Sequence, residues 1–94
     1  MDDQKSSSQK AIALQYNPDQ DHAPRVTAVG KNKLAEEIIS LARTEGIPIH
    51  QDPFLTEALA QVSISDYIPP ELYSLVAEIL AYVFRIQQQR FSQK

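Results

Sequence analysis

Apolar and polar positions alternate with a period of two near the start of the chain. Residues 11–16, Ala-Ile-Ala-Leu-Gln-Tyr, place the larger apolar side chains on every second position, which is typical of a β-strand. Residues 25–29 are rich in β-branched side chains, alternate only weakly and precede Gly30, which favours a strand covered on both faces. The Asn-Pro-Asp-Gln-Asp sequence at 17–21 predicts a turn between the two strands.

A helical period follows the second strand. Residues 32–45 repeat leucine and isoleucine at intervals of three and four, with Asn32 as the expected N-cap and Gly46 as the left-handed residue after the helix. Residues 47–50, Ile-Pro-Ile-His, predict a short third strand that carries its proline at the start or at an edge. A strand, a helix and a further strand in this order predict a right-handed crossover between parallel strands.

Prolines mark the expected starts of two more helices. Asp52 followed by Pro53 predicts a helix that runs to about Gln61, and residues 62–64 are expected to be briefly extended. The Pro-Pro-Glu sequence at 69–71 opens the longest helix, of roughly twenty residues. Its apolar stripe is wide, which allows two interpretations. The stripe is either buried in the core with only aromatic edges exposed, or part of it forms an exposed apolar patch that binds a partner. The residues that widen the stripe are Tyr73, Tyr82 and Phe84.

Length and composition fit one small globular domain. The chain has 94 residues, of which 43% are hydrophobic and 22% charged. We expect an α/β fold with a small mixed sheet of three to four strands surrounded by about three helices. Residues 1–9 are expected to form a flexible tail, residues 10–86 the domain and residues 87–94 a polar tail.

Charge and hydropathy exclude several function classes. A formal net charge of −3 provides no basic face for nucleic acid. The chain has no cysteine, no apolar run long enough to span a bilayer and no signal peptide, so we expect a cytoplasmic protein without a transmembrane segment.

The chain offers little for catalysis or metal binding. His22 and His50 have no His, Cys or carboxylate partner at helical spacing, and the acidic turn with Asp19 and Asp21 is expected to be solvated. The two glycines are explained by backbone geometry rather than by a phosphate loop. We therefore expect no enzyme activity, no cofactor and no metal.

The order of six segments resembles the cytoplasmic domain of the FlhB/YscU family of export-gate proteins. These segments are residues 11–16, 23–30, 46–49, 52–59, 68–73 and 76–83, and the resemblance extends over about 11–86. It implies a mixed sheet wrapped by helices, sited below a membrane export channel. The implied function is a non-enzymatic component or accessory of flagellar or type III protein export, peripheral to the inner-membrane apparatus. It would bind export-gate proteins or export substrates. The alternative is a homo-oligomeric scaffold or regulator that retains the fold without an export role.

The resemblance also implies a difference in chemistry. Full-length family members carry a transmembrane domain and cleave themselves at an Asn-Pro-Thr-His sequence before the first strand matched here. The matching positions of this chain are Ser6, Ser7, Ser8 and Gln9, and a serine has no side-chain amide for the cyclisation. We therefore expect neither autocleavage nor a membrane domain, and Asn17-Pro18 is interpreted as an ordinary turn.

Two partner-binding regions follow from the resemblance. The strand that precedes the cleavage loop in the family is not expected here, so the sheet could accept a partner strand at an open edge or could simply end there beside Lys10. The candidate open edge consists of Ala11, Ile12, Ala13, Leu14, Gln15 and Tyr16. The family also implies an apolar patch for partners or substrates, and the matching residues are Ala23, Pro24, Ala77 and Leu80.

Overall fold

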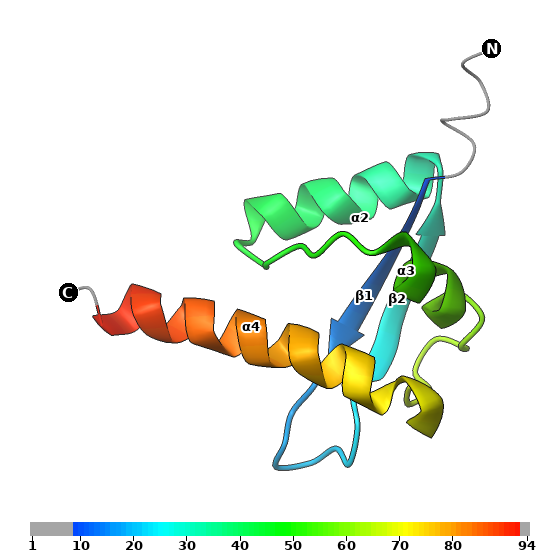
Figure 1. Cartoon of the computed structure of the whole chain (residues 1–94). Helices are drawn as coiled ribbons and strands as arrows, with labels where there is room; N and C mark the ends of the chain where they lie inside the picture. The colour runs from blue at the N-terminus through cyan, green and yellow to red at the C-terminus, as the bar shows by residue number, and fades with distance from the viewer. Residues whose placement is uncertain (1–8, 93–94) are drawn as a thin grey trace.

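Two strands and three α-helices form the framework of the domain (Figure 1). The computed structural model describes residues 9–92, with side chains to residue 86. The elements in chain order are β1 (Lys10–Gln15), β2 (Arg25–Lys31), α2 (Lys33–Thr44), α3 (Pro53–Leu59), the 3₁₀ helix η1 (Pro70–Leu72) and α4 (Tyr73–Ser92). The two strands and the three helices lie where the sequence pattern predicts them.

The sheet is an antiparallel hairpin. β1 pairs with β2 from Lys10 opposite Lys31 to Gln15 opposite Arg25. The register shifts between Ala13 and Leu14, where β2 carries one extra residue. This extra residue is Thr27, whose hydroxyl donates a hydrogen bond to the Ala13 carbonyl over 3.3 Å.

The third strand expected over residues 47–50 is not formed, so the prediction of a parallel crossover was wrong. Within residues 9–92 the sheet has two strands rather than three or four. The reason lies in how α2 ends. Gly46 has φ of 72°, its amide donates to the Arg43 carbonyl, and the Ile47 amide donates to the Ala42 carbonyl. Since Pro48 has no N–H, the first two residues of the segment offer no amide for a sheet.

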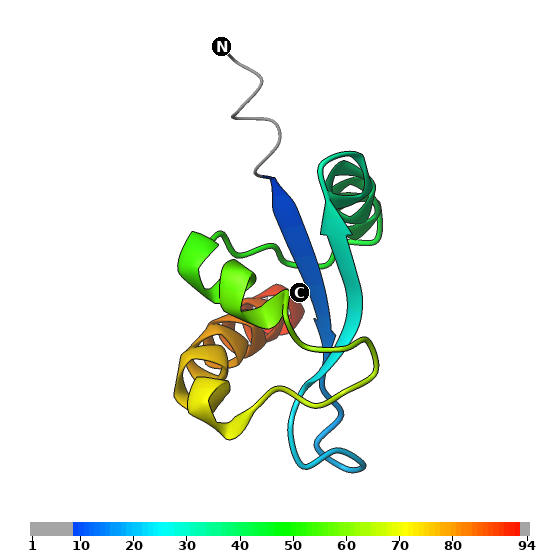
Figure 2. The same cartoon turned by 90° about the vertical axis from the view of Figure 1, so that its right-hand side faces the viewer.

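Two layers of helix enclose the hairpin (Figure 2). α2 packs against one face, where Ala35 is fully buried over Gly30. α3 and α4 cover the other face, and the core lies there. This core consists of Ala23, Val26, Leu55, Leu59, Ile68 and Val76, with Ile12, Leu14, Val29, Val62, Leu72, Ile79 and Leu80 packed around it.

The outer edge of β2 is covered by the connection between α3 and η1. The amide of Val26 donates to the Asp66 carbonyl over 3.0 Å, and the Val26 carbonyl accepts from the amide of Ser65 over 2.7 Å. Arg25 and Tyr67 form an isolated antiparallel bridge beside them. The extended pairing thus falls at residues 65–68 rather than at 62–64, and it protects one edge of the hairpin.

The helices begin largely as the sequence indicates. The Asp52 carboxylate accepts a hydrogen bond from the Leu55 amide over 3.1 Å, with Pro53 in the first turn of α3. Asn32 occupies the N-cap position of α2, but with φ of 55° its side chain makes no capping hydrogen bond.

α4 is the longest element of the domain. Val76 anchors the first half of α4 in the core, while the second half extends away from the sheet and continues to Ser92 (Figure 1). Along the described part of the chain, no helix is both long and apolar enough to cross a membrane.

Candidate partner-binding surface

The backbone of β1 is paired on one side only. The Asn32 amide donates to the Gln9 carbonyl, so Gln9 and Asn32 form a hydrogen-bonded pair at the start of the ladder. Hydrogen-bonded and non-hydrogen-bonded pairs alternate along an antiparallel ladder. Ile12 and Leu14 therefore fall in non-hydrogen-bonded pairs, and their amides point away from β2. In residues 9–92 no strand pairs with that edge. The backbone groups of Ile12 and Leu14 therefore have no ladder partner within this part of the chain.

Accessibility varies along the candidate edge. Ala11 is buried and the next three residues are half-buried, whereas Gln15 and Tyr16 are exposed. The Lys10 ammonium forms an ion pair with Glu57 of α3, with 2.7 Å from Nζ to Oε1. This contact fastens the beginning of β1 to α3.

The four residues of the predicted apolar patch differ in exposure. Ala23 is only 3% exposed and Pro24 is also buried, whereas Ala77 is exposed and Leu80 is half-buried. Ala23 belongs to the core cluster, and Leu80 packs against that cluster. The loop before β2 and the first half of α4 therefore meet, but a partner could touch mainly Ala77 and the outer part of Leu80. Ala23 and Pro24 lie beneath the surface.

A buried carboxylate holds the loop before β2. Asp21 is 6% exposed, so the expectation of a solvated acidic turn was wrong at this position. Its Oδ1 accepts a hydrogen bond from Arg25 Nη2 over 3.0 Å, and its Oδ2 accepts one from the Asn17 amide over 3.2 Å. These bonds satisfy the carboxylate and fix the loop that leads into Ala23.

Tyr67 connects this loop to the segment that covers β2. The Arg25 guanidinium carbon lies 5.3 Å from the centre of the Tyr67 ring, within cation–π range. The His22 ring lies on the same tyrosine, with 4.1 Å between ring centroids. His22 is exposed at the surface, as the sequence indicates, and its ring packs on Tyr67 beside the Arg25 charge.

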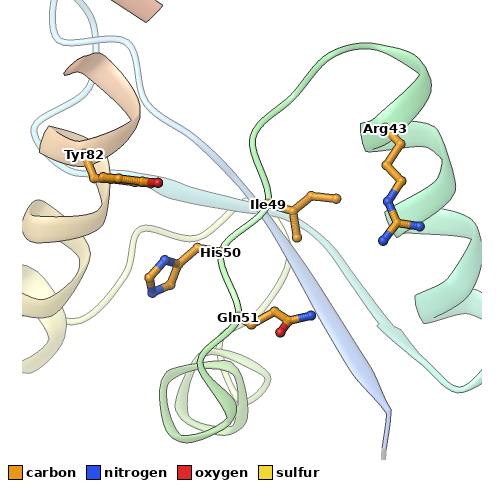
Figure 3. Close-up of a pocket in the computed structure, with 5 residues that line it drawn as sticks. All are labelled: Arg43, Ile49, His50, Gln51 and Tyr82. Atoms are coloured by element: carbon orange, nitrogen blue, oxygen red, sulfur yellow. The ribbon is translucent and has the colours of Figure 1, made fainter. Parts of the chain in front are cut away.

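Sequence reasoning missed a hollow between α2 and α4. Its volume is about 520 Å³ and it is open to solvent. Arg43 extends into it from α2, Tyr82 from α4, and the coil that joins α2 to α3 passes between them (Figure 3). The lining residues are Arg43, Ile49, His50, Gln51 and Tyr82, and we call this site the α2–α4 hollow.

Comparison with known proteins gives a consistent result. Residues 7–83 match the sequence profile described as the FlhB HrpN YscU SpaS Family. The uncharacterized protein YlqH of Bacillus subtilis (strain 168) is 40% identical over 79 residues, which cover 84% of this chain and 85% of YlqH. The flagellar biosynthetic protein FlhB of Aquifex aeolicus (strain VF5) is 46% identical over 74 residues, or 78% of this chain and 21% of that protein. The chain therefore spans about a fifth of the length of such FlhB relatives.

A solved structure supports the same relationship. The crystal structure of the cytoplasmic domain of FlhB from Shewanella putrefaciens superposes with a TM-score of 0.83 and 33% sequence identity. The match covers 89% of this chain and 66% of that domain. The α/β fold class and the resemblance inferred from the sequence are both confirmed.

Proposed function

Because the chain belongs to the FlhB HrpN YscU SpaS family, we propose that it acts in flagellar or type III protein export as a protein-binding module. The observation that carries this proposal is the match to the FlhB cytoplasmic domain over 89% of the chain. In this role the module lies on the cytoplasmic side of the export apparatus. It binds other export components or the proteins that are exported, and it carries out no reaction of its own.

The first contact surface we assign is the patch on α4. Ala77 is exposed and Leu80 is half-buried, so α4 offers small and apolar side chains to a partner. Ala23 and Pro24 lie beneath, where the Asp21–Arg25 ion pair holds their loop. A partner would therefore meet a rigid surface, which reduces the entropy lost on binding.

The second contact surface is the outer edge of β1. Backbone groups that face away from β2 can pair with an extended segment from another protein, as in other cases of β-strand addition. Main-chain hydrogen bonds would supply affinity with little dependence on sequence, and side chains beside the strand would supply selectivity.

The absence of self-cleavage is part of the same proposal. The serines at positions 6–8 lie outside the described residues. The support for this point is chemical, because a serine has no side-chain amide for the cyclisation that cleaves the chain. Mass spectrometry of the purified full chain would test this point. A stable product cut within residues 6–9 would contradict it.

Binding measurements with a matched pair of variants test the proposed function. Ala77→Asp places a charge in the patch, and Ser40→Asp places the same charge at an exposed position of α2, away from the patch. We expect the parent and Ser40→Asp to bind a purified cytoplasmic domain of an export-gate protein, or an export substrate, by calorimetry. Ala77→Asp should bind at least about tenfold more weakly, since a desolvated charge in an interface costs on the order of a kcal/mol or more.

Circular dichroism and thermal melting of all three proteins show whether each variant is folded. The proposal fails if the folded parent binds none of these proteins. If it then proves to be a stable homo-oligomer by light scattering, the alternative of a scaffold without an export role is favoured.

A further inference from the structure

The α2–α4 hollow combines a cation with apolar walls. Figure 3 shows Arg43 and Ile49 on the side of α2, and His50 and Tyr82 on the side of α4. Ile49 and Tyr82 are 43% and 51% exposed, and they lie on opposite sides of the coil that crosses the hollow. Their exposure leaves apolar area that a bound molecule could cover.

The charge of the hollow opposes that of the whole chain. Arg43 is its one permanently charged lining residue, and no carboxylate lines it. Glu45 and Glu78 are near in sequence to Arg43 and Tyr82, yet neither lines the hollow. Within the described part of the chain Arg43 forms no ion pair, although the formal net charge is −3. A carboxylate from another molecule is the group that complements it.

The shape of the hollow favours a polypeptide. Its volume of about 520 Å³ is large enough for several side chains, but it is an open depression, whereas small-molecule sites bury most of their ligand. His50 and Gln51 add ring nitrogens and an amide that can bond to a peptide backbone. An acidic peptide segment matches both this shape and these groups.

We infer that the α2–α4 hollow binds a segment of a partner protein that carries a carboxylate close to an apolar side chain. The carboxylate accepts two hydrogen bonds from the Arg43 guanidinium, and the apolar side chain covers Ile49, which lies on the same side of the coil as Arg43. This site is separate from the patch on α4. Leu80 and Tyr82 are two residues apart, which places them on opposite sides of the helix. The inference therefore does not depend on the proposed export function.

Nuclear magnetic resonance with the full chain tests the inference. The probe is a short capped peptide that contains two glutamates and two leucines, and the comparison peptide has glutamine in place of each glutamate. We expect the acidic peptide to shift the amide signals of Arg43, Ile49, His50 and Gln51 in a saturable way. The glutamine peptide should bind at least about tenfold more weakly, because it offers no charge to the guanidinium.

Two variants with the same change of charge give the control. Arg43→Ala should weaken binding of the acidic peptide about tenfold, as expected for the loss of charge-assisted hydrogen bonds. Lys33→Ala removes an exposed cation from the other end of α2 and should leave binding unchanged. Both sites are exposed, so both variants should keep the melting temperature of the parent.

Three results would overturn the inference. The first is that the acidic peptide causes no saturable shift at millimolar concentration. The second is that the glutamine peptide binds equally well. The third is that Lys33→Ala weakens binding as much as Arg43→Ala, because general attraction to a cationic surface would then explain the data.

Discussion

The Arg25 guanidinium donates to the buried carboxylate of Asp21 across 3.0 Å, and this pair closes the loop between the two strands. The same carboxylate accepts the amide of Asn17, so one side chain joins both ends of the turn. Ala23 and Pro24, which lie between the paired residues, are thereby held against the core. The position of the proposed α4 patch depends on this loop.

Asp21→Ala should destabilise the domain. The substitution leaves the Asn17 amide and the Arg25 guanidinium without their acceptor, and the lost hydrogen bonds predict a fall in unfolding free energy of about 1–3 kcal/mol. Chemical denaturation measures it. Asp19→Ala is the control. Asp19 is exposed, and it contributes to the turn through its backbone amide, which donates a hydrogen bond to Oδ1 of Asn17. Equal effects of the two substitutions would show that Asp21 has no special role.

Gly30→Ala should force α2 away from the sheet. A Cβ at this position would lie 2.7 Å from Cδ1 of Ile38 and 2.9 Å from the carbonyl carbon of Leu34. The Ile38 side chain can rotate, but the Leu34 backbone can move only with the helix, so we expect a loss of about 1–3 kcal/mol in unfolding free energy. Thermal and urea unfolding would measure it. A variant as stable as the parent would show that α2 packs less closely on β2 than described.

The Asp52 carboxylate caps α3, and its removal should weaken that helix. Asp52→Ala removes the acceptor for the Leu55 amide, which predicts a loss of about 1 kcal/mol in unfolding free energy. Asp52→Ser retains an acceptor and should recover most of the stability. Urea denaturation of the three proteins provides the comparison. If serine and alanine have equal effects, the cap does not contribute to stability.

Local signals in the sequence were enough to locate most elements. The alternation of residues 11–16, the Asp52-Pro53 pair and the prolines before α4 each reflect interactions within a few residues. These interactions persist in the folded chain, so the corresponding predictions of a strand and two helices hold.

Features that depend on the exact course of a loop, or on distant segments that come together, could not be predicted in this way. The apolar pattern of residues 47–50 suits a strand, but the turn after α2 uses the Ile47 amide. Asp21 is buried because Asn17 and Arg25 converge on it in three dimensions. The α2–α4 hollow depends on distant segments, since Arg43 and Tyr82 both line it while 38 residues separate them in the chain.

Hydrogen exchange along β1 should alternate. Ala11 and Ala13 belong to hydrogen-bonded pairs with β2, while the amides of Ile12 and Leu14 point away from it. We expect slower exchange at Ala11 and Ala13 than at Ile12 and Leu14, as measured residue by residue by nuclear magnetic resonance. Similar protection at all four amides in the free protein would mean that another segment already pairs with this edge.

Binding of a partner by strand addition should slow exchange at Ile12 and Leu14, because their amides gain hydrogen bonds. Exchange at Ala11 and Ala13 should change little. A partner that binds without this selective change uses another surface, and the proposed role of the β1 edge would be wrong.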